Sequence, residues 1–144
     1  MEDTPNIICQ IEKDIPLSDL MALYEDAQWT AYTKDPEKLK KAVDQSLLVV
    51  TIRDNKTLVG LIRVVGDGVS IVYIQDILIK KSHQRKKLGT ILVNKVLDRY
   101  KDVRQIVLLT DNKAKTINFY NSLGFKLGID KGLSCFVKFR NLEI

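Results

Sequence analysis

The stretch of the chain best suited to binding an anion is HQRKKLGT, residues 83–90. It follows an apolar, β-branched run and precedes a helical pattern, so we expect it to form the turn that starts a helix. Unpaired backbone N–H groups and the positive end of the helix dipole meet at such a turn and bind phosphate. Arg85, Lys86 and Lys87 add positive charge, and Gly89 has no Cβ to keep a ligand oxygen from the main chain.

The positive charge of the whole chain is concentrated in this region. The 144 residues carry 23 Lys and Arg against 18 Asp and Glu, and residues 80–87 hold five of these cations and no acid. Such a local surplus favours a single anion site over the long basic face of a nucleic-acid binder, with a merely solvated turn as the alternative. Neither GxxxxGK[ST] nor GxGxxG is present, which argues against nucleotide hydrolysis and dinucleotide redox chemistry.

The other reactive side chains predict little chemistry by themselves. Cys9 and Cys135 lie far apart in the sequence without a CxxC or zinc-ligand spacing, so we expect both to be reduced core residues. His83 is the single histidine and is expected on the surface, and one histidine cannot build a metal cluster, so no metal is predicted. We find no Cys or Ser nucleophile with a His–acid pair near it, which argues weakly against an acyl-enzyme.

One domain of α/β class is expected to position the basic turn. At 45% apolar residues, the chain can bury one continuous core, so residues 1–144 are predicted to form a single domain. Two amphipathic helices precede a three-stranded antiparallel meander, and a strand–helix–strand unit that favours a right-handed parallel crossover follows. The predicted strands are 6–12, 47–53, 57–65, 69–79, 105–110 and a closing strand 133–139, and the predicted helices are 16–27, 35–46, 88–100 and 113–124.

The N-terminus, MEDTPN, is acidic and polar where a signal peptide would be basic and then apolar. No apolar run approaches the ~18 residues that a membrane helix needs. We therefore expect a soluble, cytoplasmic protein with no membrane partner.

Two motifs resemble those of the GNAT superfamily of N-acetyltransferases. QRKKLGT is similar to the acyl-CoA pyrophosphate loop, Gln or Arg, two residues, Gly, one residue, Gly or Ala, with Lys87 at the middle glycine. INFYNSLGFK, residues 117–126, resembles the end of the family's fourth helix, Phe-Tyr, three residues, Gly-Phe. The order of elements fits the same family, so the resemblance implies a GNAT-like mixed sheet, an antiparallel meander plus a parallel βαβ unit, with two N-terminal helices.

The resemblance implies acetyl-CoA as cosubstrate and no metal. It also implies a bulge after Asp76 that frees backbone groups of Ile77, Leu78 and Ile79 for the pantetheine arm and the thioester carbonyl. Asn112 is expected to bond the pantetheine amides or to be only a turn residue. The residues predicted to bind the cosubstrate are Ile77, Leu78, Ile79, Gln84, Arg85, Lys86, Lys87, Leu88, Gly89, Thr90, Asn112 and Phe119.

Acetyl transfer to an amine needs a way to remove the amine proton and an acid for the departing thiolate, because a primary amine is almost wholly protonated at neutral pH. Tyr120 stands where the family often has its thiolate-protonating tyrosine, or it only packs its helix. Asp76, the one acid in an apolar strand, either orients or deprotonates the amine or forms a structural link to a backbone group or Arg63. Trp29 and Tyr32 either hold the acceptor or belong to the core.

The sequence therefore predicts an N-acetyltransferase that moves an acetyl group from acetyl-CoA to a primary amine of a small molecule or protein, by direct attack in a ternary complex. A non-catalytic CoA- or phosphate-sensing module of the same fold is the alternative. A small nucleic-acid binder ranks last, since KKSHQRKK carries no interleaved aromatic residues. A homodimer is left open.

Overall fold

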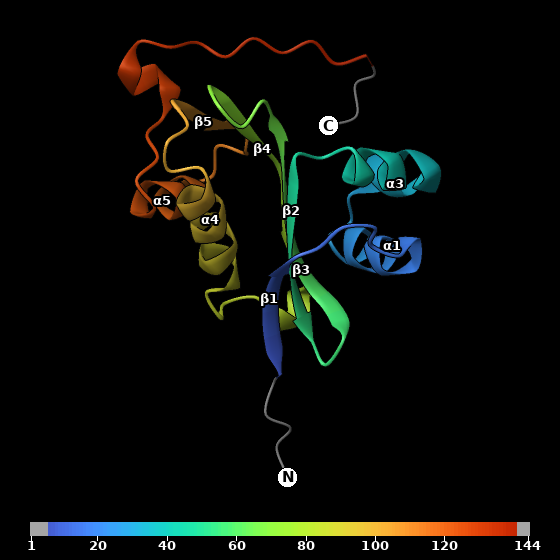
Figure 1. The fold of residues 1–144 in the computed structure, drawn as a ribbon. Helices are drawn as coiled ribbons and strands as arrows, with labels where there is room; N and C mark the ends of the chain where they lie inside the picture. The colour runs from blue at the N-terminus through green and yellow to red at the C-terminus, as the bar shows by residue number, and fades with distance from the viewer. Residues whose placement is uncertain (1–5, 141–144) are drawn as a thin grey trace. The chain divides into compact units, whose positions relative to one another are not determined.

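The computed structural model describes residues 6–140 (Figure 1). The chain forms two compact units that divide between Leu108 and Leu109. The single domain predicted for residues 1–144 stays a prediction. Residues 1–5 lie outside the described residues, and they include most of MEDTPN, the segment on which the absence of a signal peptide was predicted.

The first unit contains a five-stranded sheet in the order β1-β2-β3-β4-β5. Strands β1 to β4 pair antiparallel, and β4 pairs parallel with β5, which confirms the predicted meander and parallel unit. Asn55 and Lys56 both have positive φ, +48° and +75°, as the two-residue turn between β2 and β3 requires. The strands are β1 (Ile7–Ile11), β2 (Leu48–Asp54), β3 (Thr57–Gly66), β4 (Ile71–Ile79) and β5 (Gln105–Leu108).

Helices cover both faces of this sheet, α1 (Leu17–Asp26) and α3 (Pro36–Asp44) one face and α4 (Leu88–Arg99) the other (Figure 1). The start of α3 follows from its sequence, because the Asp35 side chain caps the backbone N–H of Lys38 and a proline occupies the first helical position. The two predicted N-terminal helices are confirmed. A third, α2 (Thr30–Thr33), is too short to show helical periodicity in the sequence.

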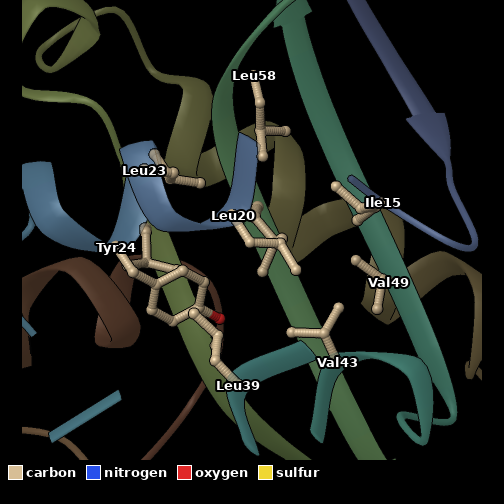
Figure 2. Close-up of a cluster of buried hydrophobic side chains, with 10 residues drawn as sticks. Ile15, Leu20, Leu23, Tyr24, Leu39, Val43, Val49 and Leu58 are labelled. Atoms are coloured by element: carbon tan, nitrogen blue, oxygen red, sulfur yellow. The ribbon is translucent and has the colours of Figure 1, made fainter. Parts of the chain in front are cut away.

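One hydrophobic cluster of the first unit lies between α1, α3 and the sheet (Figure 2). The stripe predicted for α1 supplies Leu20, Leu23 and Tyr24, which are all buried. This core fixes α1 on β3 and β4, the strands that carry the site described below. Its members are Ile15, Leu20, Leu23, Tyr24, Leu39, Val43, Val49, Leu58, Leu61 and Leu78.

The second unit differs from the prediction after its helix. Helix α5 (Ala114–Ser122) is confirmed, and the chain leaves it through Gly124 at φ +92°. A 3-10 turn follows at Gly128–Lys131, but the strand predicted for 133–139 is wrong: these residues form no strand and are exposed. Alternating apolar residues show a strand propensity, whereas a strand also needs a neighbour to pair its backbone groups.

The core prediction for the cysteines is wrong for Cys135, which is an exposed free thiol. It lies within the failed strand 133–139, so it has no sheet to be buried against. Cys9, at the centre of β1, is only partly buried because β1 is an edge strand.

Candidate active site

The predicted phosphate loop joins β4 to α4 in the first unit. It contains a 3-10 turn at Lys81–His83, and α4 begins at Leu88. Arg85, Lys86 and Lys87 are exposed, and within the described residues none of their backbone N–H groups donates to a backbone carbonyl. The first N–H groups of α4 have no acceptor inside the helix either. Free N–H groups beside three cations fit the phosphates of an anionic cosubstrate such as acetyl-CoA.

Lys87 occupies the position of the middle loop glycine and keeps a glycine-like backbone. Its φ is +62°, and φ of Arg85 is +64°, so both residues lie in the left-handed region. This conformation costs a non-glycine residue about 1–2 kcal/mol. The loop therefore keeps the shape that glycine makes easy while presenting a lysine side chain.

Substitution at Lys87 is expected to reveal this backbone strain. Lys87→Gly and Lys87→Ala remove the same charge, but only glycine adopts φ of +62° without steric cost. We expect the free energy of unfolding in urea to be about 1 kcal/mol higher for the glycine variant than for the alanine variant. Equal unfolding free energies for the two variants would show that the left-handed backbone is not strained.

Hydrogen bonds from Gln84 and Lys81 tie the loop to β4 and α1 of the first unit. The Gln84 side chain donates to the carbonyl oxygen of Ile79, the last residue of β4, at 3.2 Å. The backbone N–H of Lys81 donates to Oδ2 of Asp26, at the end of α1, at 2.8 Å. The first of the predicted loop residues therefore acts within the protein, by fixing the loop to its strand.

The structure corrects two expectations about His83. Its side chain is only 16% exposed, and Nε2 lies 2.8 Å from Oδ2 of Asp54, while Nδ1 lies 2.7 Å from Oγ of Ser82. A serine with a neighbouring His–acid pair is therefore present, contrary to the sequence analysis. The sequence could not show it, because the fold brings Asp54 beside His83 from the end of β2.

The bulge implied for β4 exists but lies at a different place. Arg63 pairs with Asp76, whereas the next residue of β3 pairs with Ile74, so Gln75 is the extra residue. The bulge therefore precedes Asp76, and the prediction that it follows Asp76 is wrong. Residues 77–79 stay paired with β3. The sequence cannot place a bulge to one residue, because its position depends on the register of the partner strand.

Beyond the bulge, β4 extends past the end of β5. Their parallel pairing ends at Ile74 and Leu108, while β4 continues to Ile79. Among the strands that the structure describes, none pairs with the edge of residues 75–79 that faces away from β3. Apart from the Ile79 carbonyl, which accepts from the Gln84 side chain, backbone N–H and C=O groups on such an edge are available to an extended ligand.

Asp76 is buried at the centre of a polar cluster. Its Oδ2 accepts hydrogen bonds from Nε of Arg63 at 2.5 Å and from the hydroxyl of Tyr24 at 2.9 Å. Its Oδ1 accepts from the hydroxyl of Tyr32 at 2.8 Å, and Nη2 of Arg63 donates to the same hydroxyl at 3.1 Å. The link to Arg63 that the sequence analysis weighed as the structural alternative is thus observed.

The protonation of this cluster follows from its burial. Burial raises the pKa of Tyr24, and the Asp76 carboxylate raises it further. The pKa of Tyr32 is raised by the same two causes in the same order. Burial, the largest single effect, would lower the pKa of Arg63, but the charge and the hydrogen bond of Asp76, together with Tyr32 and Tyr24, outweigh it and the pKa is raised. Both phenols therefore keep their protons at neutral pH, and the guanidinium offsets the charge of Asp76.

Trp29 and Tyr32 lie together beside this cluster. Their rings stack at 6.1 Å and 27°, and Tyr24 meets Tyr32 edge to face at 5.2 Å. Both Trp29 and Tyr32 pack against the core but stay partly exposed. They therefore form part of the core and also part of the surface above Asp76.

The second unit holds the remaining predicted residues. Tyr120 is 9% exposed and packs edge to face on Phe119 and Phe125, with ring centroids 5.0 and 5.7 Å apart. Burial raises the pKa of Tyr120, and the Asp111 charge raises it further. The phenol thus carries its proton at neutral pH. Asn112 is exposed in the segment before α5.

Sequence reasoning did not select Arg63, Tyr24, Asp54 or His83 as site residues. A signal for Arg63 existed, because it is the one charged residue in the apolar run of β3, as Asp76 is in β4. Two such opposite charges on consecutive strands predict a buried ion pair. No comparable local signal marked Asp54.

A cavity of about 430 Å³ lies elsewhere in the first unit, lined by residues at the end of β1, the start of β2 and the end of α3. It includes none of the predicted site residues. Among the described residues, no three His, Cys, Asp or Glu side chains form a metal-binding group. No helix among those residues is long and apolar enough to cross a bilayer.

Comparison with known proteins identifies the family. The family model for the acetyltransferase (GNAT) family matches residues 15–125. Two curated soybean (Glycine max) proteins, named histone acetyltransferase TAP1 and probable acetyltransferase TAP2, are 26% and 27% identical over 126 residues, 78% of this chain. The chain spans about half the length of each, 53% and 49%.

Solved structures agree with that match. A GNAT family acetyltransferase from Streptococcus pneumoniae is 30% identical with a TM-score of 0.84, over 93% of this chain and 98% of that protein. The PaiA N-acetyltransferase of Thermoplasma acidophilum, solved with coenzyme A, shares the fold at a TM-score of 0.63 and 15% identity, over 84% of this chain and 90% of that protein. With the family model covering most of the sequence, the chain belongs to the GNAT family of acetyltransferases.

Proposed function

We propose that the protein is an acetyl-CoA-dependent N-acetyltransferase that transfers the acetyl group to a primary amine by direct attack in a ternary complex. The observation that carries this proposal is the loop between β4 and α4, with its free N–H groups and exposed cations at a helix start. Membership of the GNAT family supports the same activity.

Acetyl-CoA supplies an activated acetyl group as a thioester. Its phosphates are proposed to lie on residues 84–90, where the N–H groups and the cations of the loop bind them. The pantetheine arm is proposed to bond the free edge of β4 at residues 77–79, which runs directly into the loop. Asn112 and Phe119, both in the second unit, remain proposed cosubstrate-binding residues.

The acceptor amine is proposed to bind beside Trp29 and Tyr32, above Asp76. Among residues 6–140, Oδ1 of Asp76 accepts only from Tyr32, so this oxygen keeps a lone pair for an N–H group of the amine once the half-buried tyrosine ring shifts. Because the Arg63 ion pair offsets the carboxylate charge, the geometry supports orientation of the amine more than removal of its proton.

Tyr120 is proposed to protonate the thiolate that leaves when the amine attacks. Its raised pKa keeps the proton available at neutral pH, and within residues 109–140 no group hydrogen-bonds its hydroxyl. Phe119 and Phe125 fix the ring, so that the hydroxyl has a defined direction.

Neutralising Arg85 and Lys86 together is expected to weaken CoA binding at low salt. Both side chains are exposed, so their attraction for phosphate is screened as salt rises. We expect about a tenfold loss at low ionic strength, or ~1.4 kcal/mol, and a clearly smaller loss at high salt. Calorimetry with CoA and with pantetheine, which has no phosphate, measures this, and equal binding of the two compounds by the unaltered protein would contradict the phosphate site.

Turnover tests the enzymatic proposal directly. Free thiol released from acetyl-CoA is followed against a panel of small primary amines, a polyamine and a lysine-rich peptide, the last because one curated relative is named a histone acetyltransferase. Thiol release that depends on an amine and yields an acetylated product supports the proposal. Tight CoA binding without release across the panel would favour the non-catalytic CoA-sensing alternative.

A further inference from the structure

The phosphate loop is held by a side-chain contact that family membership does not explain. Asp54, the last residue of β2, reaches the loop through His83, with Oδ2 and Nε2 2.8 Å apart. Both side chains are largely covered, 19% and 16% exposed. The contact therefore joins the loop to a hairpin that is distant in sequence.

Both partners of this contact are themselves fixed. The second carboxylate oxygen of Asp54, Oδ1, accepts from the backbone N–H of Asn6 at 3.2 Å. The other ring nitrogen of His83 lies 2.7 Å from Oγ of Ser82, which sets the plane of the ring. Since neither side chain is free to turn away, the contact restrains the backbone at residue 83.

By charge alone, Asp54 should oppose the binding of an anion. Its hydrogen bond with His83 holds the pKa of the carboxyl below its usual range, and the charge of Lys86 acts in the same direction, so the group is ionised at neutral pH. A carboxylate close enough to Lys86 to feel its charge also repels phosphates bound there. Any favourable effect of Asp54 on CoA binding must therefore be geometric.

We propose that Asp54 and His83 are positioning residues that hold the phosphate loop in the conformation that binds CoA. This inference rests on the proposed function of the loop. Arg85 and Lys87, two and four residues after His83, are held in the left-handed region. Such strained conformations persist only where the surrounding structure restrains them. Without the restraint the loop relaxes, and its free N–H groups no longer converge on the phosphates.

Two substitutions of Asp54 separate geometry from charge. Asp54→Asn and Asp54→Ala remove the same negative charge, but only asparagine keeps an oxygen that can accept from His83. If Asp54 acted by charge alone, both variants would bind CoA more tightly and equally. The positioning role instead predicts that the alanine variant binds CoA about tenfold more weakly than the asparagine variant. This difference corresponds to the free energy that one hydrogen bond contributes.

Calorimetry with CoA and with pantetheine at low salt measures the difference, and thermal melting shows that both variants are folded. Pantetheine affinity is expected to be the same in the two variants, since that ligand lacks the phosphates. His83→Ala, which leaves the Asp54 charge in place, is expected to weaken CoA binding relative to the unaltered protein. The variant that combines Asp54→Ala with His83→Ala should bind CoA no more weakly than His83→Ala alone, because the same contact is already lost in the single variant.

The outcomes distinguish this inference from the function on which it rests. If the unaltered protein binds CoA and pantetheine equally, the phosphate site itself is wrong. If the unaltered protein prefers CoA but Asp54→Ala matches Asp54→Asn, the positioning role is wrong. It is also overturned if acetyl-CoA leaves a hydroxylamine-labile acetyl adduct that Ser82→Ala abolishes, since Ser82, His83 and Asp54 would then form a nucleophilic site.

Discussion

Replacing Asp76 with asparagine is expected to lower the free energy of unfolding by about 3–5 kcal/mol, the cost of leaving one partner of a buried ion pair uncompensated. The substitution keeps the side-chain volume but leaves the guanidinium of Arg63, only 6% exposed, without its counterion. Urea unfolding at neutral pH measures the loss.

The pair is tested by a double-mutant cycle. Arg63→Met should cost a similar amount, because it leaves the Asp76 carboxylate buried alone, and the double variant should cost clearly less than the sum of the two. Additive losses would contradict a coupled pair. The cycle measures stability alone and does not depend on the function of the protein.

The role of Asp76 toward the acceptor is tested by measuring turnover at a temperature below the melting temperature of every variant, so that each variant is folded. We expect Asp76→Asn to keep CoA affinity while amine turnover falls, and Arg63→Met, which retains the carboxylate, to keep more turnover for each folded molecule. If Asp76→Asn loses CoA affinity and turnover in equal measure, Asp76 has only the structural role of its contacts with Arg63, Tyr24 and Tyr32.

Tyr120→Phe is expected to reduce turnover by roughly 10² or more while acetyl-CoA affinity changes only a few fold, the usual scale for loss of a general acid. The change removes one oxygen and leaves the ring packed on Phe119 and Phe125. Phe125→Leu is the matched control, since it disturbs this packing without touching the hydroxyl. Phe125→Leu should lower the melting temperature but leave turnover far closer to that of the unaltered protein than Tyr120→Phe does.

The pH profile gives an independent measure of the same group. A general acid works in its protonated form, so its contribution persists at low pH and is lost as pH rises through its pKa. Because burial and the Asp111 charge raise the pKa of Tyr120 above its ordinary value of 10.0, its alkaline limb should lie above pH 10. A limb that Tyr120→Phe leaves in place, or unchanged turnover in that variant, would reduce the tyrosine to a packing residue.

Most elements were predictable because local patterns determine them. The apolar stripe of α1, the Asp35 cap and proline of α3, and the two-residue turn before β3 each reside in a few consecutive residues. The strand predicted for 133–139 failed because its alternating pattern specifies no partner strand. Helix α2 was not predicted, because its four residues are too few to show helical periodicity.

For the candidate site, the sequence by itself determined the family, the basic loop at the start of α4, and the identity of a lone acid in β4. These depend on residues adjacent in the chain, where composition and spacing suffice. Only the tertiary structure decided the partners: Arg63 and two tyrosines on Asp76, Asp54 on His83, and the bulge at Gln75. The physical reason is that strand register and helix packing bring these groups together across 13 to 52 positions of sequence. Lone opposite charges on consecutive strands make Arg63 a candidate partner of Asp76, but no local pattern points to Tyr24, Tyr32 or Asp54.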